Sequence, residues 1–151
     1  MPFHFRFESI LKLREQTRDE AGRAVAQANE AIAKIDSQAA SIAAEQQQLR
    51  DQGTTGRIGK VSVDSLLTQG RYGLQLEADL ANLSNTRQQL LAELSRRQEV
   101  LTAAEADVKR YERLRERAQS EFHAQQQKKD QHEMDEAAQR AYLRESPRFS
   151  G

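Results

Sequence analysis

The feature that most constrains the fold of this chain is a narrow line of apolar residues that recur alternately every four and three positions. That spacing keeps side chains on one face of an α-helix and is typical of a coiled coil. Between residues 7 and 49, ten of the thirteen positions on the spacing are apolar. The sequence therefore predicts a helix over about residues 3–50 that buries a single stripe. The positions are Phe7, Leu11, Arg14, Arg18, Ala21, Val25, Ala28, Ile32, Ile35, Ala39, Ile42, Gln46 and Leu49.

A second line with the same spacing runs from residue 76 to residue 122, and eleven of its fourteen positions are apolar. It predicts a second helix over about residues 73–143, followed by a flexible tail over 144–151. The positions are Leu76, Leu80, Leu83, Arg87, Leu90, Leu94, Arg97, Leu101, Ala104, Val108, Tyr111, Arg115, Ala118 and Phe122.

Glycines separate the two lines. Gly53, Gly56 and Gly59 fall within seven residues, a density that favours a turn because glycine weakens a helix. We expect the turn, together with a short helix capped by Ser62 or Asp64, to occupy residues 51–72. An apolar cluster is expected beside it, made of Leu66, Leu67, Tyr72 and Leu74.

Two helical stripes joined by a short turn fold back on each other, so the predicted fold is all-α, a single antiparallel two-helix coiled-coil hairpin spanning residues 1–151. Paired residue numbers should sum to about 122 or about 129. The first register is favoured, because it sets small residues against large ones, as at Ala28 with Leu94. Beyond about Ala118 the second helix has no partner and should form an overhanging C-terminal arm.

Composition excludes several functions. No cysteine is present, the three histidines lack the further ligands of a helical metal site, and a two-helix rod offers no substrate pocket, so we expect no metal, no cofactor, no small-molecule substrate and no enzyme activity. The 23 basic residues balance the 23 acidic ones, which disfavours nucleic acid. No signal peptide or membrane-spanning run is apparent, which is compatible with the cytoplasm.

Two local features point toward other proteins. The segment 109–117 holds five basic and two acidic residues. It is open to three interpretations: a solvated face, a surface that meets acidic groups of a partner protein, or a nucleic-acid contact. Phe3, Phe5 and Phe7 stand at the N-terminus, where they either staple the helix start or anchor a partner.

Two stretches of the chain resemble the FliJ family of flagellar type III export proteins. The first is the opening Phe3-His4-Phe5-Arg6-Phe7, which leads into a leucine-rich helix. The second is the segment Tyr111–Glu116, followed by Lys128-Lys129 and Met134–Ala137. With the length and the hairpin plan, the resemblance covers nearly the whole chain.

The resemblance implies a non-enzymatic component of the export apparatus, similar to the central stalk of rotary ATP synthases. Its terminal end would bind and promote the hexameric ring of the export ATPase, FliI. A surface near the turn would touch the export gate protein, FlhA, and export chaperones would bind as well. The protein would be cytoplasmic and held through its partners at the inner face of the membrane at the flagellar base.

Carried onto this sequence, the resemblance implies two sets of contact residues. The ATPase end would use Phe3, Arg6, Phe7, Arg14, Arg110, Arg113 and Arg117. The gate-facing patch would use Leu66, Leu67, Tyr72 and Leu76. The alternative from the residues alone is a structural coiled coil, unrelated to export, that self-associates through the apolar cluster and the arm.

Overall fold

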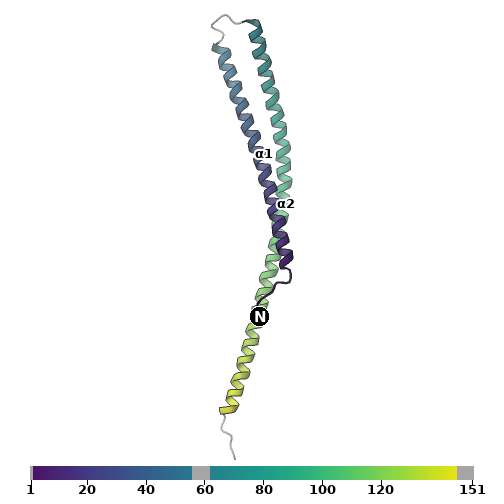
Figure 1. Ribbon diagram of the computed structural model, residues 1–151, viewed down its shortest axis with the longest axis vertical. Helices are drawn as coiled ribbons and strands as arrows, with labels where there is room; N and C mark the ends of the chain where they lie inside the picture. Colours follow the sequence, from purple (N-terminus) through teal and green to yellow (C-terminus); the bar gives the residue numbers. More distant parts are fainter. Residues whose placement is uncertain (1, 56–61, 146–151) are drawn as a thin grey trace, which may run out of the picture. The chain divides into compact units, whose positions relative to one another are not determined.

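In the computed structural model, which describes residues 2–55 and 62–145, the chain forms two long helices (Figure 1). Helix α1 spans Glu8–Thr55 and helix α2 spans Val63–Glu145. No strand occurs in these ranges. The two helices pack against each other, which confirms the predicted all-α hairpin.

The contacts divide the chain into two compact units, and each unit takes a part of both helices. The terminal unit comprises Met1–Gln16 and Glu105–Gly151, and the central unit comprises Thr17–Ala104. Within each unit a segment of α1 lies against a segment of α2. The two units are described separately below.

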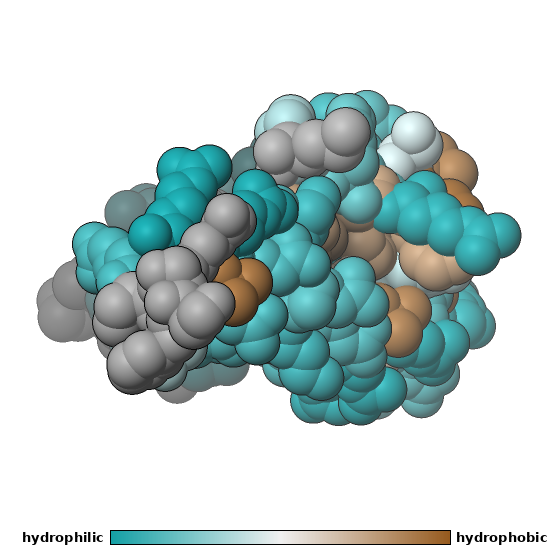
Figure 2. Space-filling model, turned by 90° about the horizontal axis from the view of Figure 1, so that it is seen from below, coloured by the Kyte–Doolittle hydropathy of each residue, from teal (hydrophilic) through white to brown (hydrophobic). Residues whose placement is uncertain are grey.

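The stripes predicted from the sequence form the interface of the central unit. Ala21, Ala28, Ile32, Leu76 and Ala104 are buried there, and most other positions on the two lines are half-buried. Arg87 is an exception, because its side chain is 44% exposed. So narrow a core leaves many polar residues at the surface, and hydrophilic residues cover most of the end of the molecule that Figure 2 shows, with hydrophobic ones between them.

Three contacts between the helices establish the register of the central unit. Arg87 Nε lies 2.7 Å from Asp36 Oδ1, and Arg97 Nη1 lies 2.7 Å from the carbonyl oxygen of Ala24. A Cβ added to Gly73 would lie 3.4 Å from Leu49 Cδ2. The paired numbers sum to between 121 and 123, so the favoured register is confirmed.

Arg97 lies on the seam, and its guanidinium group contacts the partner helix. It donates to the carbonyl of Ala24 and to Glu93 Oε1, at 2.7 and 3.1 Å, and the side chain is 32% exposed. The small Ala24 and Ala28 let the guanidinium group reach the backbone of α1, which satisfies its donors at the helix interface.

Helix α1 begins at Glu8, five residues later than predicted. Residues 2–7 form no helix, and the amide of Glu8 donates to the carbonyl of Phe5 over 3.3 Å. Phe5 is buried, with only 9% of its surface exposed. The non-helical segment lets Phe5 be buried, and burial of aromatic area offsets the loss of one further helical turn.

The turn also differs from expectation. Helix α1 continues through Gly53 to Thr55, although Arg50 was its predicted end. A single glycine costs a helix only about 1 kcal/mol relative to alanine, which a long packed helix tolerates. Gly56 and Gly59, the other glycines of the predicted turn, lie outside the described residues.

Helix α2 starts ten residues earlier than predicted. Its first turn is capped by Ser62, whose Oγ accepts a hydrogen bond of 3.1 Å from the amide of Ser65. The helix then runs unbroken through Gly70 and Gly73. The separate short helix expected within 51–72 is therefore the beginning of α2. At the other end α2 extends to Glu145, and residues 146–151 of the expected tail lie outside the described residues.

The terminal unit is held together by a small apolar core. Leu11 and Val108 are almost completely buried, with 0% and 2% of their surfaces exposed. Aromatic rings extend this core, because the ring centroids of Phe7 and Tyr111 lie 6.5 Å apart. Those of Phe3 and Phe122 lie 5.5 Å apart. The N-terminal segment is thereby fastened to α2.

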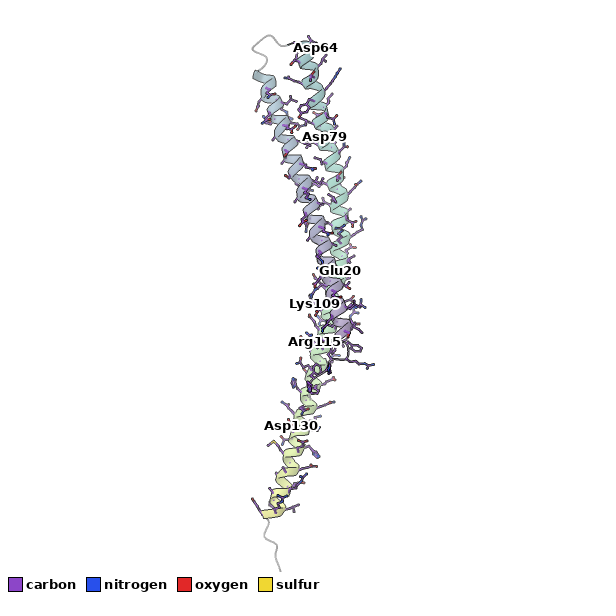
Figure 3. All side chains as sticks on the ribbon, in the orientation of Figure 1. Glu20, Asp64, Asp79, Lys109, Arg115 and Asp130 are labelled. Atoms are coloured by element: carbon purple, nitrogen blue, oxygen red, sulfur yellow. The ribbon has the colours of Figure 1, made fainter. Side chains whose placement is uncertain are left out.

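From residue 123 to residue 145, every residue of α2 is exposed. This stretch, which includes Asp130 in Figure 3, is the predicted arm. Its sequence explains the exposure, because the next five positions that continue the four-three spacing after Phe122 are polar: Gln125, Lys129, His132, Glu136 and Gln139. With no apolar stripe left, the arm has nothing to bury against α1.

Candidate functional site

A basic groove runs along α2 in the terminal unit. Lys109 and Arg110 each stand three or four residues before Arg113, which stands four before Arg117, so the four share one broad helix face. This face points away from Val108 and Tyr111, which pack toward α1. Together with Ala106 and Leu114, the four basic residues line an open hollow, here called the basic groove. Figure 3 labels Lys109 at its start.

The charges of the basic groove are largely uncompensated within the chain. Arg110 makes a long ion pair with Asp107, at 3.8 Å, and 71% of its side chain is exposed. Among residues 2–55 and 62–145, no ion pair or hydrogen bond occupies Lys109, Arg113 or Arg117. All four side chains are exposed. Their donors are thus open to an external acceptor.

An aromatic hollow adjoins the basic groove and shares Leu114 and Arg117 with it. Its other lining residues are His4, Phe5, Arg6, Phe7, Ala118 and Glu121. The Arg6 guanidinium carbon lies 5.4 Å from the centre of the Phe7 ring, a cation–π contact. The aromatic hollow therefore places two N-terminal residues, Arg6 and Phe7, beside the basic residues of α2.

Five of the seven residues expected at the ATPase end are brought together in this way, and two are not. Phe3 lines a different hollow, together with Glu8, Arg115 and Gln119, and Arg115 pairs with Glu8 at 3.8 Å. Arg14 occupies a predicted seam position but is exposed, and it lines neither the basic groove nor the aromatic hollow.

Several residues that line these hollows were not among the predicted contact residues, and Leu114 and Phe5 are two of them. Leu114 is 38% exposed and stands where the basic groove meets the aromatic hollow. Leu114 follows Arg110 by four residues and precedes Ala118 by four. This spacing in the sequence indicates that the three residues share one helix face. Phe5 forms the buried floor, and its alternation with Phe3 and Phe7 gave no indication of which ring would be covered.

The gate-facing patch is only partly a surface. Leu66, Leu67 and Tyr72 are 53%, 55% and 47% exposed, as a docking surface requires. Leu76 is 4% exposed and belongs to the seam, so its assignment to a surface patch is wrong. The apolar cluster expected around these residues is not formed among the described residues, since Leu66, Leu67 and Leu74 are each more than half exposed.

Tyr72 is tied to α1 by a hydrogen bond. Its hydroxyl donates to Glu45 Oε2 over 2.5 Å. This hydrogen bond and the negative charge of Glu45 raise the pKa of Tyr72 above its ordinary value of 10.0. This hydrogen bond fixes the hydroxyl relative to α1, and 47% of the residue stays exposed.

A further hollow, which the sequence did not indicate, lies between the helices of the central unit. It is lined by Gln38, Ser41 and Ile42 of α1 and by Asp79, Asn82, Leu83 and Thr86 of α2. The small Ala39 opposite Leu83 leaves this part of the seam open. Asp79 is labelled in Figure 3.

The chemistry offered by these side chains is that of binding. His132 Nε2 lies 3.2 Å from Glu136 Oε1 on the arm. The residues that the structure describes contain no group of three or more histidine, cysteine, aspartate or glutamate residues placed to hold a metal ion. Within the same ranges, no helix is long and apolar enough to cross a membrane.

Comparison with protein families finds a match over nearly the whole chain. The model of the flagellar FliJ protein covers residues 3–147 of the 151 in the chain. The chain belongs to the FliJ family. The resemblance seen at its two ends is thus confirmed, and the FliJ-family chain is a component of the flagellar type III export apparatus. FliJ proteins are structural export components and are not known as enzymes. Comparisons with curated proteins and with solved structures find no match.

Proposed function

We propose that this FliJ-family chain is a non-enzymatic stalk that binds the hexameric ring of the FliI-type export ATPase and promotes its assembly and activity. The observation that carries the proposal is the basic groove, where Lys109, Arg113 and Arg117 have no ionic partner among the described residues. The aromatic hollow, with Arg6 and Phe7, continues the same surface.

The make-up of this surface suggests what it binds. Arginine presents a planar fork of donors that suits carboxylates, and Phe7 and Leu114 offer apolar area beside it. A partner surface with acidic side chains around an apolar residue would complement it. Because the whole chain has equal numbers of basic and acidic residues, steering toward such a partner must come from this local charge.

The proposal includes a second contact near the start of α2. Leu66, Leu67 and Tyr72 would face the FlhA-type export gate, and export chaperones would bind the same protein. The protein would act in the cytoplasm and be held at the inner face of the cell membrane, at the flagellar base, through these partners. Leu76 takes no part, because it is buried.

The test is the ATPase rate and ring assembly of the FliI-type ATPase from the same organism, measured with increasing amounts of this protein. Stimulation with a shift to hexamers is expected. The double variant Arg113→Glu, Arg117→Glu should need at least about tenfold more protein for the same effect, equal to about 1.4 kcal/mol. Helicity should be unchanged, since both side chains are exposed.

The arm supplies a matched control. Arg140 and Arg144 are also exposed arginines four residues apart on α2, but they lie far along the chain from the basic groove. Arg140→Glu with Arg144→Glu should stimulate like the unmodified protein. Equal effects of the two double variants would remove the basic groove from the ATPase contact. No stimulation by the unmodified protein would favour the structural coiled coil instead.

A further inference from the structure

Between Val63 and Leu76, helix α2 carries an apolar face that α1 does not cover. On the covered side of the helix, Leu76 enters the seam. The uncovered face consists of Val63, Leu67, Gly70 and Leu74, here called the outer stripe. Its three large side chains are 71%, 55% and 66% exposed. A Cβ added to Gly70 would meet nothing within 4 Å, so the space above the stripe is open.

The residues of the outer stripe are spaced by four, three and four positions, which is the spacing of a coiled-coil seam. A helix face that stays in water does not need this spacing. Inside the hairpin, the same spacing occurs where two helices pack against each other. The outer stripe therefore fits a helix that approaches from outside the hairpin.

We propose that this helix is α2 of a second copy of the chain, packed antiparallel along the outer stripe. In an antiparallel pair, Val63 can lie opposite the partner's Leu74 while Leu67 lies opposite the partner's Gly70. By the two-fold symmetry of such a pair, each layer occurs twice. The second layer sets a large side chain against glycine, which allows the helices to approach closely.

The charged residues beside the outer stripe favour a second copy of the chain as the binding partner. Asp64 and Arg71 are seven residues apart, so they lie on the same flank of α2. Asp64 is labelled at the start of the helix in Figure 3. In the antiparallel register given above, Asp64 of each copy meets the partner's Arg71, and symmetry makes two such ion pairs. Parallel packing would set this flank against the partner's Leu66 and Gly73 instead and leave both charges unmatched.

The interface is short, with four layers and two ion pairs. It would bury far less than the roughly 1,200 Å² at which stable complexes begin, so the association is weak and depends strongly on concentration. It would also cover Leu67 of the proposed gate-facing patch. The association itself does not depend on the export role, but if both hold, a second copy and the gate compete for Leu67.

Sedimentation velocity of the full chain over a wide range of concentrations tests the proposal. The unmodified protein should shift from monomer to dimer as its concentration rises. Leu67→Asp should raise the dimer dissociation constant at least about tenfold. Val100→Asp is the matched control, because Val100 is 59% exposed on the same helix and lies outside the outer stripe; it should dimerise normally.

Charge exchange tests the register. Asp64→Arg alone should weaken the dimer, since it sets two arginines against each other, and addition of Arg71→Asp should restore it. The chain has no cysteine, so Val63→Cys and Leu74→Cys can be introduced cleanly. A mixture of these two variants should form a mixed disulfide faster than either variant forms its own.

Three results would overturn the proposal: a monomer at every concentration, failure of the exchanged pair to restore the dimer, or equal cross-linking in the single-variant samples. A Leu67→Asp variant that loses binding to the FlhA-type gate while the unmodified chain stays monomeric would assign the stripe to the gate. Helicity measured by circular dichroism should be the same for all variants, because every substituted side chain is exposed.

Discussion

Leu11 and Leu13 stand two positions apart on α1, yet 0% of the first and 59% of the second is exposed. The difference follows from helix geometry, because two positions turn a side chain by more than half a revolution. Leu11 faces the core of the terminal unit with Val108, whereas Leu13 faces outward. The same residue type thus has two roles that only its position on the spacing distinguishes.

Leu11→Ala should lower the free energy of unfolding by about 2–5 kcal/mol, because it leaves a cavity in a core with few other members. Leu13→Ala removes the same atoms from a largely solvated position and should change the free energy by less than about 0.5 kcal/mol. Urea unfolding of both variants measures the two values. Similar losses would show that Leu11 is not a core residue.

Glu93 should make the stability of the central unit depend on pH. Arg96 and Arg97 donate to its carboxylate, at 2.6 and 3.1 Å, and hold its pKa below the ordinary value of 4.5. A carboxyl group with a lowered pKa stabilises the folded state fully above its unfolded pKa. That contribution is lost as the pH falls through the lower folded pKa.

Glu93→Gln should therefore melt at a lower temperature than the unmodified protein at pH 7, and the difference should disappear as the pH is lowered through 4.5 and below. Calorimetry at a series of pH values provides the measurement. Glu99→Gln, a change at an exposed glutamate on the same helix, serves as the control. A difference that persists in strong acid would show that the Glu93 ion pairs are not its cause.

At the scale of the helices, the four-three spacing predicted which side chains meet but not where the helices end. Burial follows the spacing closely along both helices, with Arg14 and Arg87 as exposed exceptions. The ends depend on competing local energies. A packed seam carried α1 through Gly53, and the burial of Phe5 delayed its start. Each shift of a helix end changes the free energy by only about 1 kcal/mol per residue. Residue types alone do not predict differences of that size.

Leu94→Asp should disrupt the hairpin, because it places a carboxylate in the seam opposite Ala28, which is buried. We expect the free energy of unfolding to fall by more than about 2 kcal/mol. Leu91→Asp makes the same change three residues away, at a side chain that is 39% exposed, and should cost less than about 1 kcal/mol. Thermal melting followed by circular dichroism distinguishes the two, and unchanged melting of Leu94→Asp would contradict the register.

At the scale of the whole molecule, the stability of the hairpin should not depend on the arm. A chain that ends after His123 should melt at the same temperature as the full chain, because residues 123–145 bury nothing against α1. Only the helical signal that the arm itself contributes should be lost. A lower melting temperature would reveal that the arm packs against another part of the protein.

The sequence by itself predicted the all-α hairpin, its two stripes and the favoured one of two registers, because a repeat sustained over many turns buries its apolar area when the two stripes face each other. The FliJ family was indicated by the resemblance of stretches near the two ends of the chain. Only the tertiary structure decided that Leu76 is buried while Leu66 and Leu67 are exposed, and that Phe5 is the covered ring. It also placed Arg6 and Phe7 beside Arg117. These outcomes depend on how the N-terminal segment folds back and on where α2 begins. Both are set by small differences between competing contacts, which appear only when the parts of the chain meet.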